Sequence, residues 1–183
     1  EIINISYVKE KVYRDYQPVL TSLDLFLPTY ISTKAYLDPD VSACGDLTRE
    51  NGTYTLTASV NNTGTCFIVL ANNITLNCNG YTINYSSNGT FGYGVNVTGY
   101  NFTTIKNCVI KEGVSTTNAK YAIYLVNASN GMINNNSIRT TGNSGHDIYL
   151  VTSSNNTVVN NTATTSGSGA YGIYLNLNSS YNT

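Results

Sequence analysis

The last third of the chain repeats itself with a fixed period. The motif Ile-Tyr-Leu begins at Ile123, Ile148 and Ile173, so successive copies are 25 residues apart. A period of this length is typical of a solenoid, in which each repeat buries its apolar side only against its neighbours. The repeat therefore limits the fold to a stack of similar units.

The residues within one period indicate strands. Ile-Tyr-Leu alternates inward and outward positions, and a second short run, 132–138 or 157–163, is bounded by Asn pairs and Gly-Ser clusters. Two-residue alternation with many Thr, Val, Ile and Tyr residues is typical of strands, and no convincing helical apolar pattern is present. Each period can hold about three strands of five residues with their turns. We therefore expect each repeat to be one coil of an all-β parallel helix, with coils about 4.8 Å apart.

Stacked coils would place equivalent side chains in columns. The Ile residues of the motif, together with Leu125, Leu150 and Leu175, are expected to form inward aliphatic ladders. At the corners, Asn tolerates the left-handed backbone of a sharp bend, and stacked amides can bond to one another. We assign this corner position to Asn107, Asn135 and Asn160, with the last two pointing inward.

The run YAIYLVNASNGMINNNSI, with the earlier NITLNCNGYTI and TTIKNCVI, resembles the right-handed parallel β-helix repeats of the pectin-lyase-like superfamily. The resemblance covers 44–183 and is greatest to the catalytically silent, Asn- and Thr-rich versions in archaeal and bacterial cell-surface proteins. It implies a right-handed β-helix, but no particular activity, because the superfamily includes enzymes, adhesins and purely structural proteins.

The chain changes composition near residue 43. Residues 1–43 contain all three prolines and no glycine, whereas 44–183 contain 15 glycines and no proline. The predicted β-helix of about five coils starts at Cys44, with an early coil around 54–56 and later coils entered at Ile68, Val95 and the three Ile-Tyr-Leu motifs. We expect Gly- and Ser-rich corners to absorb the differences in coil length. The chain starts without Met and stops inside a repeat, which suggests a processed N-terminus and a chain that continues or is capped.

Residues 1–43 form an extended N-terminal β segment in this interpretation. It is either a cap over the first coil or a strand that adds to a neighbouring subunit. Its apolar residues are the candidates for assembly: Ile2, Ile3, Ile5, Leu23, Leu25 and Leu27.

Four cysteines provide a second constraint. Cys44 and Cys66 are 22 residues apart, and Cys78 and Cys108 are 30 apart. Each separation is near one coil, which would bring the α-carbons within disulfide range. We predict these two disulfides, with buried free thiols as the alternative. No close cysteine pair suits a metal, and disulfides would indicate an oxidising compartment.

The surface is predicted to be polar and glycosylated. Charged residues make up 10% of the chain and the net charge is −1, so there is no basic surface for nucleic acid, and no apolar run is long enough to span a membrane. There are 13 Asn-x-Ser/Thr sequons. The candidates for N-glycans are Asn51, Asn61, Asn84, Asn88 and Asn178, whereas we expect no room for a glycan at the corner residues Asn135 and Asn160.

Catalysis is not expected. Glycoside hydrolysis needs two facing carboxylates, and the acids of the predicted β-helix, Asp46, Glu50, Glu112 and Asp147, do not share a strand face in neighbouring coils. His146 occupies the repeat position of two tyrosines, so we expect a ring within a ladder. The lysines at 106, 111 and 120 and the arginine at 139 are read as solvated charges at different corners. We predict no metal and no cofactor.

The outward tyrosines of the repeats, Tyr124, Tyr149 and Tyr174, are expected to form an exposed stripe. The stripe could stack on a glycan, pack laterally against another subunit, or pack within its own sheet. The function we expect is that of a secreted, archaeal, non-enzymatic subunit of an extracellular filament or surface layer that assembles as a homo-polymer. An adhesin or glycan-binding module is the alternative, followed by a polysaccharide lyase or hydrolase.

Overall fold

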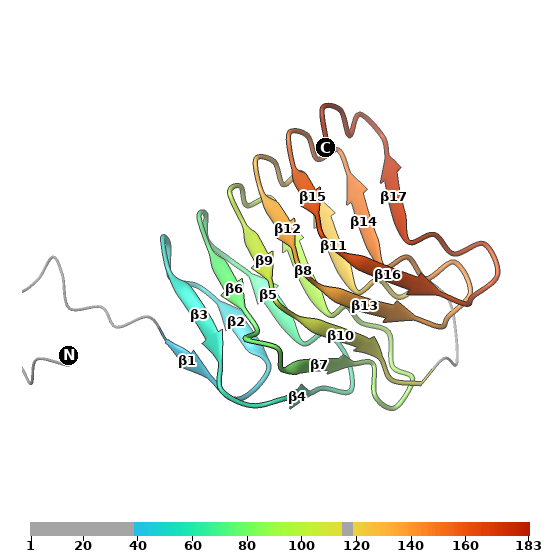
Figure 1. Cartoon of the computed structure of the whole chain (residues 1–183), viewed down its shortest axis with the longest axis horizontal. Helices are drawn as coiled ribbons and strands as arrows, with labels where there is room; N and C mark the ends of the chain where they lie inside the picture. Colours follow the sequence, from blue (N-terminus) through green and yellow to red (C-terminus); the bar gives the residue numbers. More distant parts are fainter. Residues whose placement is uncertain (1–38, 115–118) are drawn as a thin grey trace, which may run out of the picture. The chain divides into compact units, whose positions relative to one another are not determined.

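The computed structural model describes residues 39–114 and 119–183. These residues form 17 short strands and no helix, in three parallel sheets that run along a β-solenoid of about five coils. Figure 1 shows the strands of successive coils side by side, from β1 to β17. The expected all-β, parallel solenoid is confirmed.

Each coil contributes one strand to each sheet. Sheet A contains β1 (Asp40–Val41), β3 (Thr53–Leu56), β6 (Thr75–Asn77), β9 (Thr104–Lys106), β12 (Met132–Asn134) and β15 (Thr157–Val159). Sheet B contains β2 (Gly45–Leu47), β5 (Phe67–Val69), β8 (Val95–Thr98), β11 (Ile123–Val126), β14 (Ile148–Val151) and β17 (Ile173–Asn176). Sheet C contains β4 (Val60–Asn61), β7 (Thr82–Tyr85), β10 (Val109–Glu112), β13 (Ser137–Thr140) and β16 (Thr162–Thr165).

The aliphatic ladders lie where the repeat places them. Ile123 pairs with Ile148, which pairs in turn with Ile173, and the leucines two residues later are equally in register. The first two members of each ladder are buried, whereas Ile173 and Leu175 are 49% and 45% exposed, since no described coil covers them. Full burial of such a side chain contributes about 1.5–3 kcal/mol, so coil-on-coil packing is the main source of stability.

The predicted entry to the second coil is wrong by one residue. Phe67, and not Ile68, pairs with Val95, and the buried side chains of β5 are Phe67 and Val69. The sequence Phe-Ile-Val-Leu is apolar throughout, so its alternation does not reveal the inward face. Residues 54–56 of the predicted early coil lie in β3 of sheet A, whereas the later coil entries lie in sheet B.

The three corners differ in how they vary. The corner from sheet B to sheet A always has five residues: 48–52, 70–74, 99–103, 127–131 and 152–156. Its fourth residue has a positive φ in every coil, between 55° and 61°, and is Asn in all coils but that of Phe102. Asn tolerates this conformation better than most residues. The corner from sheet C to sheet B, which we call the variable corner, absorbs the differences in coil length, as predicted.

The described solenoid starts with β1, which pairs with β3, a few residues before the predicted boundary at Cys44. All six candidate assembly residues of the N-terminal segment lie outside the described residues.

Candidate functional site: an aromatic stripe beside a buried polar corner

The outward tyrosines of sheet B form a column. Tyr124, Tyr149 and Tyr174 pair in register on β11, β14 and β17, and each is half-buried. The repeat predicted their shared position, but the expected exposure is not observed, because the neighbouring rings cover part of each side chain. Tyr149 lies 5.5 Å from Tyr124 and 5.1 Å from Tyr174, measured between ring centroids.

A second column of rings lies beside the first, at the end of the variable corner. It consists of Tyr93, Tyr121, His146 and Tyr171, and Phe91 extends it by an edge contact with Tyr93. Together with the tyrosines of sheet B these residues form one connected set, with centroids 4.7–5.9 Å apart, which we call the aromatic stripe. Sequence analysis placed His146 in the ring position of Tyr121 and Tyr171, and the structure confirms that position.

Ring orientation limits what the aromatic stripe can bind. Tyr93 and Tyr124 stack at 4.8 Å with 20° between planes, Tyr149 and Tyr174 stack at 24°, and Tyr121 and His146 stack at 3°. In each of these pairs, the face of one ring is turned toward the face of the other. Because sugars stack on open aromatic faces, a stripe of mutually stacked rings is poorly suited to hold a glycan along its length. It is better suited to stiffening the solenoid and to packing against another flat surface.

Burial shifts the pKa of several rings of the aromatic stripe toward the uncharged form. It raises the pKa of Tyr121 to about 12, and neighbouring tyrosines add to the effect. The pKa of His146 is lowered by burial, and its Nδ1 accepts a hydrogen bond of 3.0 Å from the main-chain N–H of Tyr171. An imidazole held in this way is neutral and has one ring nitrogen occupied, so His146 has the environment of a structural residue.

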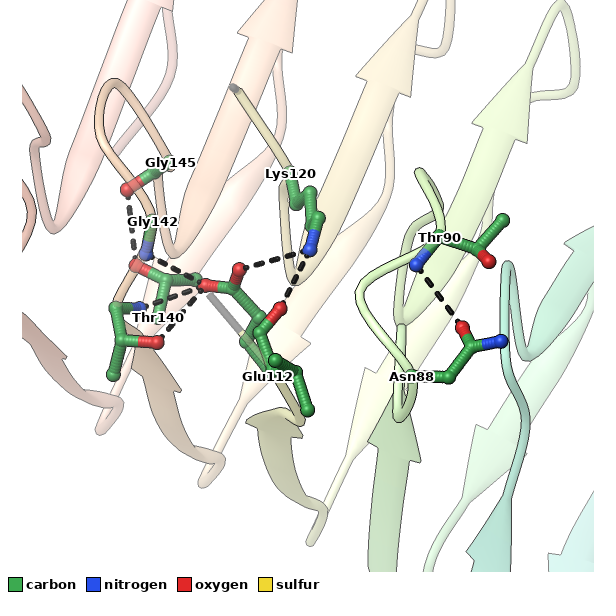
Figure 2. Close-up of polar contacts among 9 residues, drawn as sticks. Asn88, Thr90, Glu112, Lys120, Thr140, Gly142 and Gly145 are labelled. Atoms are coloured by element: carbon green, nitrogen blue, oxygen red, sulfur yellow. Dashed lines mark hydrogen bonds and ion pairs between the residues drawn. The ribbon is translucent and has the colours of Figure 1, made fainter. Parts of the chain in front are cut away.

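The interior of the variable corner contains a cluster of ionisable groups, which we call the buried polar cluster: Tyr85, Glu112, Lys120 and Asp147. The side chains of Glu112 and Lys120 are fully buried, with 3.6 Å between Lys120 Nζ and Glu112 Oε1. Figure 2 shows the Glu112 carboxyl group between Lys120 and the main chain at Gly142. That main chain donates two hydrogen bonds to Glu112 Oε2, from Thr141 N at 2.7 Å and Gly142 N at 2.9 Å.

Asp147 adds a second buried carboxyl group. Its residue is 0% exposed, and neither carboxylate oxygen has a hydrogen bond of ordinary geometry in the described part of the chain. Burial raises the pKa of Asp147 to about 7; the nearby Thr140 lowers it and the charge of Glu112 raises it further. Burial raises the pKa of Tyr85 well above its usual value, and the charges of Glu112 and Asp147 raise it further.

Sequence reasoning missed the buried polar cluster. Reading Lys120 as a solvated charge is wrong, because the residue is 0% exposed. Placing Lys111 and Arg139 at different corners is also wrong, because they are direct neighbours on β10 and β13. One signal was present: Glu112 follows the inward Ile110 at two-residue spacing and pairs with Tyr85. Extending the inward alternation from Ile110 to Glu112 would have predicted that the Glu112 carboxyl group lies inside.

Both predicted disulfides are confirmed. Cys44 is bonded to Cys66 and Cys78 to Cys108, and each pair has α-carbons 4.7 Å apart. The first bond joins the coils of β2 and β5, and the second joins those of β6 and β9. The N-terminal coils are therefore covalently linked, whereas the later coils carry the aromatic stripe.

The corner asparagines have the predicted left-handed backbone, but the predicted inward direction of their side chains is not observed. Asn107, Asn135 and Asn160 have φ between 55° and 56°, and Asn135 Nδ2 donates a 2.9 Å hydrogen bond to Asn107 Oδ1. Asn135 and Asn160 are exposed, so the prediction that they point inward is wrong. The reason for excluding a glycan at these two residues is therefore lost. The buried amide in this corner belongs to Asn136, which bonds to Asn161 Oδ1 and to the carbonyl oxygen of Ile105.

The candidate glycosylation residues differ in accessibility. Asn51, Asn61, Asn88 and Asn178 are exposed, whereas Asn84 is half-buried and its Nδ2 donates a 2.7 Å hydrogen bond to Asn61. Asn88 Oδ1 accepts a hydrogen bond of 3.0 Å from the main-chain N–H of Thr90, the third residue of its own sequon. Figure 2 shows the Asn88 amide nitrogen directed away from Thr90.

Within the described ranges, no group of three or more His, Cys, Asp or Glu residues is placed to hold a metal ion. The same residues contain no helix with the length and apolar character of a membrane span.

The fold and these features define a disulfide-linked parallel β-solenoid. Comparisons with protein-family models, with curated proteins and with solved structures gave no match.

Proposed function

We propose that this chain is a rigid, non-enzymatic structural segment of an extracellular filament or cell-surface layer. The observation that carries the proposal is the linkage of successive coils by contacts other than backbone pairing. Disulfides join the early coils, side-chain amides bond across the corners, and stacked rings run along the later coils. A solenoid reinforced in this way resists bending and local opening, as a load-bearing element must.

The position of the acids supports a role without catalysis. The fold brings Glu112 and Asp147 together; as whole residues they are 7% and 0% exposed, and the side chain of Glu112 is fully buried. A polysaccharide could not reach either carboxyl group without opening the variable corner. Lyase or hydrolase activity is therefore the weakest candidate.

Two disulfides support an oxidising, extracellular location, and exposed sequons support N-glycosylation. The resemblance to catalytically silent β-helix proteins of archaeal and bacterial surfaces agrees with both. In this proposal the copies assemble as a homo-polymer through the N-terminal segment, and end-to-end stacking of coil ends is the alternative route, which would leave polymers after that segment is removed.

A deletion tests the assembly part of the proposal. Removing residues 1–37 leaves β1 and both disulfides in place, and polymers of the full chain should be lost. The triple variant Tyr124→Ser, Tyr149→Ser and Tyr174→Ser is the matched comparison. If the aromatic stripe is a glycan-binding face instead, this variant assembles normally but loses affinity in a glycan array, and the deletion leaves both properties unchanged.

A further inference from the structure

The Lys120 amine and the Glu112 carboxyl group face each other in a site that excludes water. Lys120 Nζ lies 3.6 Å from Glu112 Oε1, and both side chains are 0% exposed. Reactants held at such separations react as if they were highly concentrated. We infer that the protein joins these two residues itself, by an amide bond between Lys120 Nζ and Glu112 Cδ. This modification would close residues 112–120 into a covalent ring, whatever the biological role of the solenoid.

The two oxygens of the Glu112 carboxyl group have different surroundings. Oε2 accepts hydrogen bonds from the main-chain N–H groups of Thr141 and Gly142, at 2.7 and 2.9 Å. Two convergent N–H donors at these distances stabilise the negative oxygen of a tetrahedral intermediate in acyl transfer. Oε1 has no hydrogen bond among the described residues and lies on the side of Lys120. The carboxyl group thus has one stabilised oxygen and one that is free to leave.

The amine is held in position. Lys120 Nζ donates a hydrogen bond of 2.7 Å to the carbonyl oxygen of Val114, which fixes the end of a long, flexible side chain. A lysine amine attacks a carbonyl carbon in its neutral form. The reaction therefore needs a nearby group that accepts a proton from the ammonium.

Asp147 is suited to carry that proton. It is buried, neither of its carboxylate oxygens has a hydrogen bond of ordinary geometry among the described residues, and it is close enough to Glu112 for their charges to interact. Its main-chain carbonyl accepts a hydrogen bond from the N–H of Ile123, three residues after Lys120. In the balanced step, the ammonium of Lys120 passes a proton to Asp147, and Nζ attacks Glu112 Cδ. Asp147 then returns that proton to Oε1, which takes the second proton that Nζ loses and departs as water, so that Asp147 ends in its starting state. No oxidant, reductant or cofactor is needed.

Tryptic mapping of the full chain, secreted from a host that forms disulfides and then deglycosylated, tests the inference. Trypsin cleaves after Lys111, Lys120 and Arg139. The amide blocks cleavage at Lys120, so the expected product is one peptide, 112–139, lighter than its sequence by one water, with fragment ions that place the loss between Glu112 and Lys120. Separate peptides 112–120 and 121–139 of unaltered mass would overturn the inference and leave a buried ion pair.

Two variants separate the bond from its alternatives. Lys120→Arg keeps the positive charge but removes the primary amine, so normal cleavage and full mass should return. A water loss that persists in this variant would place the dehydration elsewhere and refute the assignment. Asp147→Asn keeps the pair but removes the proton carrier, and the linked fraction should fall. An unchanged linked fraction would remove Asp147 from the reaction.

Discussion

Asp147 makes the stability of the solenoid depend on pH, and a single substitution should remove that dependence. Its carboxyl group is fully buried, and its pKa rises from an ordinary value of 3.8 to about 7, chiefly because burial disfavours the charged form. In the unfolded chain the same group ionises near its ordinary value. The folded state therefore binds one more proton than the unfolded state between these two pH values.

The sign and size follow from proton linkage. Since the folded pKa is the higher one, the stabilisation is fully present below the unfolded pKa and is lost as the pH rises through the folded pKa. The free energy of unfolding should fall by about 1.4 kcal/mol per pH unit between pH 4 and 7, or about 4 kcal/mol in all. Asp147→Asn removes the ionisation, so the variant should gain this amount relative to wild type as the pH rises.

Urea unfolding of both proteins between pH 4 and 8 measures the difference. The lowered pKa of His146 acts in the opposite direction near pH 6, but it is common to both proteins and cancels. Asp46→Asn, at an exposed position of sheet B, is the matched control for removing one carboxyl group from the surface instead of the interior. A difference between wild type and Asp147→Asn that stays constant with pH would refute the reasoning.

Three further predictions concern the other links between coils and the surface. Replacing both cysteines of the Cys78–Cys108 disulfide with Ser removes a cross-link between residues 30 apart in the sequence. The free energy of unfolding should fall by about 3–4 kcal/mol, and an unchanged urea midpoint would contradict this. Tyr149→Ala removes four ring contacts and should lower the free energy of unfolding by about 2–4 kcal/mol in the same assay. Tyr81→Ala, outside the aromatic stripe, should lower it less, and equal losses would show that ring stacking is unimportant. Asn88→Gln should lower the mass of the secreted protein by one N-glycan, and an unaltered glycan mass would exclude that site.

The fold was predictable because the sequence repeat is regular in the last three coils. In the last three coils the period is constant, so strand pairing, the aliphatic ladders and the outward tyrosines follow from spacing alone. The disulfides were predictable for a related reason. One coil of stacking brings equivalent positions to the distance that a disulfide requires.

The errors arose where the sequence has no alternation to read. Phe67 to Leu70 are all apolar, so the inward face of β5 is ambiguous. Asn134, Asn135 and Asn136 are the same residue type in and around a two-residue corner, so their order does not reveal which amide is buried. The structure resolves this ambiguity through the buried hydrogen bonds of Asn136.

The buried polar cluster was harder to predict because its members come from different coils. Tyr85, Glu112 and Asp147 are joined by the variable corner, whose length changes from coil to coil, so no fixed spacing relates them. Side chains of this kind are rarely buried, and a single sequence favours exposed positions for them. Strand register pairs Tyr85 with Glu112, whereas only the backbone path of the corner shows that Asp147 shares their interior.

Self-assembly is the central claim for function, and electron microscopy of the secreted, disulfide-bonded 183-residue protein at neutral pH, without added ligand, tests it most directly. A self-assembling chain should form filaments or sheets with a regular repeat of a few nanometres, which disappear when residues 1–37 are removed. Dispersed single particles across the accessible concentration range would contradict it, and would favour the aromatic stripe as a binding face.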